Sequence, residues 1–245
     1  MTEADAIADR LRRAVCVLFD FDGPICHLYA ERPASEVALS ISEALGVRPQ
    51  RDPDDPHALL RAPRNGDTRA GRTPPAPMHE IEQLITRMEE EAARTAAPTA
   101  EVDAVIAVLS QHAVRLAITS NNAPGPIAGY LRRVGLHPHF EDRIFGRRPE
   151  NPDLMKPDPD CIERALAELA VRESDRSRCL FLGDSEADAA AARQAGVVFL
   201  GFVPDRHAAI ASSKRELLLD AGAAYVFQGM AELLEAFSRT PLDPT

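Results

Sequence analysis

Six short apolar runs, separated by segments with helical periodicity, constrain the fold of this chain more than any other feature. The runs cover residues 14–20, 114–120, 143–146, 178–184, 197–202 and 223–227. Most are too short and too continuous for amphipathic helices, and continuous apolar runs are typical of parallel strands buried on both faces. Between them, apolar residues recur at helical spacing, as at 127–134, and glycines such as Gly135 and Gly196 mark helix ends. The alternation predicts an α/β fold with a doubly wound parallel sheet and right-handed crossovers.

One interval breaks this alternation and predicts an inserted helical domain. From about residue 27 to 98 no strand-like run appears, and two helical patterns, at 37–45 and 81–88, flank a stretch rich in proline and arginine. We expect a helical cap domain at residues 27–97 and an α/β core domain at residues 1–26 and 98–245. The hinges are expected at 26–33 and 95–99, with Thr99 as the N-cap of the next helix.

Composition and charge exclude several classes of protein. The chain has 245 residues, 45% of them hydrophobic, which is enough for one sizeable α/β core and an accessory domain. A net charge of -10 argues against nucleic acid or an anionic membrane as a partner. No apolar stretch is long enough to cross a bilayer, and the N-terminus lacks the order of a signal peptide, so we expect a cytoplasmic protein. The four cysteines have no metal-ligand spacing, which favours reduced, mostly buried thiols.

Polar residues gather where the predicted strands end. Asp20 and Asp22 end the first run in the sequence DFDG, and three later junctions read ITSNN (118–122), LMKPDP (154–159) and FLGDSEAD (181–188). Ligands of open parallel sheets bind outside the carboxyl ends of the strands, near the point where strand order reverses. We therefore expect these four segments to meet at one edge of the sheet and to form a site.

The order and residue types of these segments resemble the four motifs of the haloacid dehalogenase superfamily. The resemblance is to its aspartate-nucleophile phosphatases with an inserted helical cap, such as those similar to phosphoglycolate phosphatase. DFDG (20–23) matches the first motif, Ser120 the second, Lys156 the third and GDSEAD (183–188) the acidic fourth. Pro24 departs from the family, which more often has threonine or a small aliphatic residue there.

This resemblance implies an Mg²⁺-dependent phosphomonoester hydrolase acting on a small organic phosphate. Asp20 is then the nucleophile that forms an aspartyl-phosphate, and Asp22 is the general acid and base. Ser120, backbone amides near Asn121, and Lys156 hold the transferring phosphoryl group. The implied Mg²⁺ ligands are Asp20, the backbone carbonyl of Asp22, and Asp184.

Two residues have supporting roles in this reading. Gly23 permits the sharp departure from the strand that places Asp22. Asp188 lies one helical turn after Asp184 if Ser185 caps that helix, so its carboxylate can support the metal or its waters.

Other readings stay open at this stage. A sugar phosphomutase of the same superfamily would use the same core, and a non-catalytic phosphate-binding regulatory protein could be built on the same fold. A dehalogenase is disfavoured because that branch lacks the second aspartate, here Asp22. The partner we expect is a small-molecule phosphate ester, and the protein is expected to be a monomer or homodimer.

The insertion carries the residues expected to contact the rest of the substrate. We expect a single arginine of the insertion to reach the site and recognise a carboxylate or second phosphate, although a solvated loop is at least as good an account. The histidines show no metal or triad spacing, and His57 and His79 are weaker candidates for substrate contact. The candidate arginines are Arg48, Arg51, Arg61, Arg64, Arg69 and Arg72.

Overall fold

A six-stranded parallel sheet forms the centre of the molecule, as the apolar runs predict. The computed structural model describes residues 3–46, 52–61, 77–204 and 211–239. The strand order is β5-β4-β1-β6-β7-β8, with every pair parallel. All six strands lie within or directly beside the predicted runs. Their bounds are β1 Cys16–Phe19, β4 Arg115–Thr119, β5 Ile144–Phe145, β6 Cys179–Gly183, β7 Val198–Val203 and β8 Tyr225–Gln228.

Both faces of the sheet are buried, which is why the strands are continuously apolar. Side chains alternate along β1: Val17 and Phe19 join one hydrophobic cluster, whereas Cys16 and Leu18 join the cluster on the opposite face. The four cysteines are buried and form no disulfide, as expected. Within the described residues, no helix combines the length and apolar character needed to cross a membrane.

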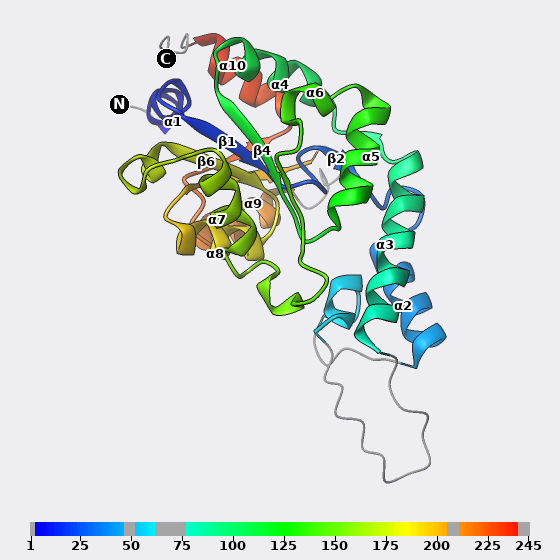
Figure 1. Cartoon of the computed structure of the whole chain (residues 1–245). Coiled ribbons are helices and arrows are strands. Elements are labelled where there is room, and N and C mark those ends of the chain that lie inside the picture. Colours follow the sequence, from blue (N-terminus) through cyan, green and yellow to red (C-terminus); the bar gives the residue numbers. More distant parts are fainter. Residues whose placement is uncertain (1–2, 47–51, 62–76, 205–210, 240–245) are drawn as a thin grey trace.

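Helices cover the two faces of the sheet (Figure 1). Gly135 and Gly196 end α5 Pro124–Val134 and α8 Glu186–Ala195 in the left-handed conformation, as expected for helix C-caps. Two short 3₁₀ helices, η3 Pro152–Leu154 and η4 Glu173–Arg178, lie in connections. On one face lie α1 Glu3–Arg12, α4 Val102–Gln111, α5 Pro124–Val134, α6 His137–Phe140 and α10 Met230–Arg239. On the other lie α7 Asp160–Glu168, α8 Glu186–Ala195 and α9 Ala211–Asp220.

The insertion is helical and has a hydrophobic cluster of its own. It contains α2 Ala34–Leu45, η1 Pro56–Leu59 and α3 Met78–Thr95. Their apolar side chains pack together with Met155, a residue of the connection between β5 and α7. We call the described residues between β2 Cys26–His27 and β3 Ala97–Pro98 the cap; it extends away from one end of the sheet (Figure 1).

Two details of the chain crossings, the segments that lead into and out of the insertion, differ from the sequence-based expectation. A small antiparallel ladder, β2 Cys26–His27 with β3 Ala97–Pro98, joins the two chain crossings where no strand was expected. Thr99 is not the N-cap of α4: that helix begins at Val102 with Glu101 as N-cap, and no side chain caps it. The Thr99 hydroxyl instead donates to the Gly23 carbonyl oxygen at 2.6 Å, so it ties the second crossing to the DFDG turn.

Candidate functional site

The four polar segments meet at the carboxyl end of the sheet, as predicted, and border a cleft of about 200 Å³. Strand β1 is central, and the chain moves to β4 and β5 on one side before it crosses to β6 on the other. The cleft therefore lies at the point where strand order reverses. Its sheet side includes Asp20, Asp22, Ser120, Asn121, Lys156 and Asp184. Its cap side includes Tyr29, Ala34, Asp55, Pro56 and His57.

Asp20 is a nearly buried carboxylate at the end of β1. Its Oδ1 accepts hydrogen bonds from the Phe21 amide at 2.7 Å and from Lys156 Nζ at 2.8 Å. Burial, together with the neighbouring carboxylates of Asp188 and Asp184, raises the pKa of Asp20 to about 7, although the Lys156 ammonium opposes that rise. Asp20 thus needs more positive charge nearby to stay fully ionised at neutral pH.

Lys156 supplies the buried cation of the site. Its ammonium group donates to Asp20 Oδ1 at 2.8 Å, Asp188 Oδ1 at 2.5 Å and the Thr119 carbonyl oxygen at 3.2 Å. Burial opposes the charged ammonium, but the carboxylates of Asp188 and Asp20 raise its pKa above the ordinary value. All three ammonium hydrogens therefore have acceptors, and Lys156 joins the first, second and fourth motif segments.

Asp188 fixes the start of α8 and the loop that carries Asp184. Its Oδ2 accepts from the Asp184 amide at 3.1 Å and from the amide and hydroxyl of Ser185 at 3.0 and 2.7 Å. Ser185 caps α8 in a capping box with Asp188, which confirms the expected cap. Carboxylate oxygens of Asp20, Asp184 and Asp188 lie within 4.8 Å of one another. Three hard oxygen donors at this spacing suit a divalent cation such as Mg²⁺.

Two glycines and a lysine shape this carboxylate cluster. Gly23 has φ +107°, and a Cβ there would lie 2.8 Å from Asp184 Cγ, so a larger residue would both strain the turn and displace Asp184. A Cβ at Gly183 would likewise meet the Asp188 side chain at 2.8 Å. Lys214, from α9, donates to Asp184 Oδ2 at 2.8 Å. Lys214 lacks a sequence signal because it follows no strand and belongs to none of the four motifs.

Asp22 faces the cleft from the turn that leads to the cap. Its Oδ1 accepts from the Leu28 amide at 3.0 Å, just beyond β2. The turn is closed by the Gly23 amide, which donates to the Cys26 carbonyl oxygen at 2.8 Å. The Asp22 carboxylate is therefore held by the first crossing into the cap.

Ser120 and Asn121 follow β4 and lie beside Lys156. The Ser120 hydroxyl donates to Asn122 Oδ1 at 3.0 Å and accepts from the Asn122 amide at 3.2 Å. The Asn121 side chain accepts from the Lys156 amide at 2.7 Å and donates to the Lys156 carbonyl oxygen at 3.2 Å. Asn122 was not predicted as a site residue, although it ends the polar segment ITSNN (118–122).

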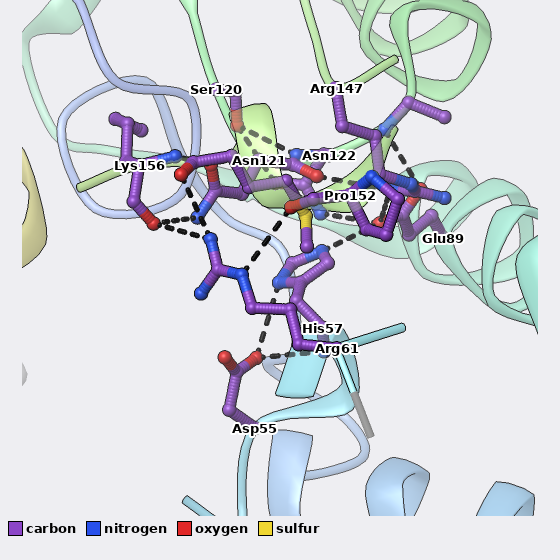
Figure 2. Close-up of polar contacts among 12 residues, drawn as sticks. Asp55, His57, Arg61, Glu89, Ser120, Asn121, Asn122, Arg147, Pro152 and Lys156 are labelled. Atoms are coloured by element: carbon purple, nitrogen blue, oxygen red, sulfur yellow. Dashed lines mark hydrogen bonds and ion pairs between the residues drawn. The ribbon is translucent and has the colours of Figure 1, made fainter. Parts of the chain in front are cut away.

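A buried ionic network joins the cap to this loop (Figure 2). Glu89 of α3 is fully buried, and its carboxylate accepts from Arg147 Nη1 at 2.6 Å, Asn122 Nδ2 at 2.9 Å and His57 Nε2 at 3.0 Å. Burial opposes the charged form of Glu89, but the His57 hydrogen bond and the Arg147 charge lower its pKa to about 2. Arg147, which follows β5, also binds Glu82 through Nε at 2.9 Å. Glu82, Glu89, Arg147 and His57 lie outside the four polar segments of the sequence, whereas Asn122 ends the segment ITSNN (118–122).

His57 lines the cleft, as the sequence suggested, but both ring nitrogens have partners within the cap. Nδ1 lies 3.2 Å from Asp55 Oδ1, and Nε2 lies 3.0 Å from Glu89 Oε1. His79 is exposed on α3 and is not among the cleft residues. Burial disfavours a charged ring, but the carboxylates of Asp55 and Glu89 raise the pKa of His57 to about 9. His57 is therefore protonated at neutral pH.

Arg61 does not reach the cleft as a substrate contact. Its Nη2 donates to the carbonyl oxygens of Met155 at 2.9 Å and Lys156 at 2.8 Å, and its Nε donates to that of Pro152 at 3.4 Å. The expected arginine contact is thus not made by Arg61. The other five candidates, Arg48, Arg51, Arg64, Arg69 and Arg72, lie outside the described residues.

The family of the chain is identified by a match that covers most of its sequence. A family model described as haloacid dehalogenase-like hydrolase matches residues 15–196, which include every motif residue of the cleft. The chain belongs to the haloacid dehalogenase-like hydrolase family. No curated protein sequence matches the chain.

Solved structures of this family share the fold of the chain. CbbY from Rhodobacter sphaeroides in complex with phosphate is 23% identical, with a TM-score of 0.65 over 92% of this chain and 99% of that chain. A mutant of CbbY in complex with xylulose-(1,5)bisphosphate is 21% identical, with a TM-score of 0.65 over 90% and 96% of the two chains. A family hydrolase from Deinococcus radiodurans with bound phosphate and sodium is 22% identical, with a TM-score of 0.58 over 96% and 100%. The similarity extends through the cap, because nearly all of each chain is covered.

The His57 network generates a pH-dependent prediction for stability. The pKa of His57 is about 9 in the folded chain and about 6.5 in an unfolded chain. The stability that the His57 charge contributes is fully present below pH 6.5 and is lost as pH rises through 9. The free energy of unfolding should fall by on the order of 3 kcal/mol across that window because of this residue.

Urea denaturation of the wild type and of His57→Gln at several pH values between 6 and 10 measures this contribution. The difference between the two proteins isolates His57, and it should shrink toward alkaline pH. His79→Gln, an exposed histidine of the same cap, is the control and should follow the wild type. Parallel curves for the wild type and His57→Gln would contradict the assignment.

Proposed function

We propose that this family hydrolase is a phosphomonoester hydrolase that acts on a small organic phosphate with Asp20 as its nucleophile. The observation that carries the proposal is the convergence of Asp20, Lys156, Ser120 and Asp184 on one cleft at the end of β1. A carboxylate beside a buried ammonium and a hydroxyl-bearing loop suits phosphoryl transfer, where positioning and charge compensation dominate catalysis. The phosphate bound to CbbY is consistent with this chemistry.

The reaction has two displacement steps at phosphorus. In the first, an Asp20 carboxylate oxygen forms a bond to phosphorus while the ester oxygen leaves and takes a proton from Asp22. In the second, water attacks the aspartyl-phosphate and gives its proton to Asp22, which releases inorganic phosphate and restores the Asp20 carboxylate. Asp22 suits this role because its carboxylate lines the cleft two residues beyond the nucleophile.

Three groups would hold the phosphoryl oxygens. The Ser120 hydroxyl, once turned away from Asn122 Oδ1, and backbone amides near Asn121 would donate hydrogen bonds, and the Lys156 ammonium would provide the charge. Lys156 also offsets the repulsion between Asp20 and an anionic substrate, because its Nζ lies 2.8 Å from Asp20 Oδ1.

The donor set of the site fits Mg²⁺. Asp20 and Asp184, together with the Asp22 carbonyl, would hold the ion, and Asp188 would fix the Asp184 loop and Lys156 in place. When bound, a divalent cation supplies positive charge beside the nucleophile and the phosphoryl oxygens. The raised pKa of Asp20, about 7 without such a cation, supports the need for it.

We also propose that residues 27–97 form a cap domain over a core of residues 1–26 and 98–245. The ladder between β2 and β3 supports this division, because both chain crossings lie side by side there. The cap side of the cleft would then contact the leaving group and exclude water.

A further prediction separates the two aspartates of the DFDG turn. With an aryl phosphate, the leaving group needs little acid assistance, so Asp22→Asn should still form the aspartyl-phosphate and then stall. Its hydrolysis should slow by roughly 10² to 10⁴-fold because the attacking water lacks its base. Asp20→Asn should release no phenolate, since the nucleophile is absent.

Rapid mixing with nitrophenyl phosphate measures this difference. Asp22→Asn should give a burst of nitrophenolate close to one equivalent, and mass spectrometry should place the trapped phosphate on Asp20. A burst from Asp20→Asn, or a phosphate on another residue, would refute these roles. Release of inorganic phosphate from alkyl phosphates by the wild type separates hydrolysis from a mutase reaction.

Another prediction concerns Lys214. Its ammonium and a divalent cation compete for Asp184 Oδ2, so Lys214→Gln should lower the Mg²⁺ concentration needed for half-maximal activity. Arg215→Gln removes the same charge from the next residue and should shift that concentration by a smaller factor. Isothermal titration of Mg²⁺ gives the same comparison without turnover. Weaker Mg²⁺ binding by Lys214→Gln would refute the competition between Lys214 and the cation for Asp184.

A further inference from the structure

The cap is bonded to both loops that are proposed to bind phosphate. One loop follows β4 and carries Ser120, and the other connects β5 to α7 and carries Lys156. Three cap groups reach them: the Glu89 carboxylate, the Arg61 guanidinium and the apolar cluster around Met155. Figure 2 shows the Glu89 and Arg61 side chains near Asn121 and Asn122.

The first connection runs from Glu89 to Ser120. The two Glu89 oxygens accept from Asn122 Nδ2 at 2.9 Å and from the Ala123 amide at 3.0 Å. Asn122 in turn binds the Ser120 hydroxyl through its own Oδ1 and amide. A buried carboxylate of the cap therefore fixes the side chain that fixes the Ser120 hydroxyl.

Arg147 strengthens this connection from the core side. It inserts against α3, where its guanidinium binds Glu82, Thr86 and Glu89, residues that share one face of the helix. The same guanidinium donates to the Asn121 carbonyl oxygen at 3.1 Å. The loop after β4 thus has backbone and side-chain bonds to a single ionic cluster.

The second connection runs from Arg61 to Lys156. Arg61 Nη2 donates to the carbonyl oxygens of Met155 and Lys156. The second of these carbonyls belongs to the residue whose ammonium binds Asp20. The Met155 side chain is 1% exposed and packs with Leu59, Ile81 and other apolar residues of the cap. Successive residues of one core loop therefore point in two directions, Met155 into the cap and Lys156 into the cleft.

Asn121 links the two connections. Its side chain binds both the amide and the carbonyl of Lys156, while its own carbonyl accepts from Arg147. A displacement of the cap would therefore move both loops together, or would have to break these bonds.

From this geometry we propose that Glu89 and Arg61 are positioning residues that set Ser120 and Lys156 for the phosphoryl group. The cap then has a role beyond covering the cleft, because the position of the cap and the affinity for phosphate are coupled. The coupling is reciprocal: phosphate bound between the two loops stabilises the packed cap. This inference rests on the proposed phosphatase function.

Inorganic phosphate and nitrophenyl phosphate are the probes for this coupling. Glu89→Gln and Arg61→Met should each raise the inhibition constant of phosphate about tenfold and lower kcat at least about tenfold, since small misplacements of catalytic groups are costly. The Mg²⁺ concentration for half-maximal activity should change less, because neither residue contacts Asp184. Arg61→Lys should recover part of the loss, since an ammonium can still donate to one carbonyl oxygen.

The matched controls lie on exposed positions of α3. Glu90→Gln and Arg87→Met remove the same charges from the cap without touching either loop, and both should bind phosphate like the wild type. Glu89→Gln removes the negative charge that compensates Arg147 and His57, so it should be the less stable variant. The hydrogen bonds of Arg61 to described residues go to backbone carbonyls, so Arg61→Met keeps the proposal testable if Glu89→Gln unfolds.

Hydrogen exchange gives a readout that does not depend on turnover. Amides of 119–124 and 152–158 should exchange faster in Glu89→Gln and Arg61→Met, and phosphate should slow exchange in α3 of the wild type. Wild-type phosphate affinity and unchanged exchange in both folded variants would overturn the proposal. A wild type that neither hydrolyses phosphate esters nor binds phosphate would instead refute the phosphatase function, while loop exchange would still test the positioning.

Discussion

The Lys156 ammonium, held between Asp20 and Asp188, is the interaction on which the rest of the site depends. A parallel sheet ends here in three carboxylates whose oxygens lie within 4.8 Å of one another. Burying carboxylates without nearby positive charge is costly, and removing one partner of a buried ion pair costs about 3–5 kcal/mol. Lys156 compensates two of the three carboxylates, and Lys214 compensates the third. The cluster still has one more negative charge than positive, which would favour binding of the proposed divalent cation.

The fold brings these groups together through short, rigid connections. Asp20 and Asp184 directly follow adjacent strands whose register aligns Phe19 with Leu182. Gly23 and Gly183 allow close contact at the same place, because any side chain there would collide with Asp184 or Asp188. Lys156 differs from these residues, because it comes from a long connection that is held by the Asn121 side chain and by the cap. The negative half of the site is thus set by the sheet, and the positive half depends on loops.

That division explains what could be predicted from the sequence. The six strands and the cleft residues Asp20, Asp22, Ser120, Asn121 and Asp184 follow from local patterns, namely apolar runs that end in polar residues. Lys156 lies far beyond the end of β5, and only the resemblance to the third family motif pointed to it. Met155 is an example of what could not be predicted, because it reads as a core residue yet packs with the cap. Glu89 and Arg147 are 58 positions apart, and a glutamate on an amphipathic helix is ordinarily a solvated residue. The Thr99 N-cap was wrong for a similar reason: its hydroxyl found the Gly23 carbonyl, a partner that only the folded chain brings near.

The most direct test of this account is the thermal stability of Lys156→Met with and without Mg²⁺. Without the ammonium, the carboxylates of Asp20 and Asp188 lose their buried partner, so the metal-free variant should melt about 10 °C below the wild type. Mg²⁺ should then raise the melting temperature of the variant more than that of the wild type, because the cation replaces part of the missing charge. Equal melting temperatures without Mg²⁺, together with equal shifts on its addition, would contradict the claim that Lys156 holds the carboxylate cluster together.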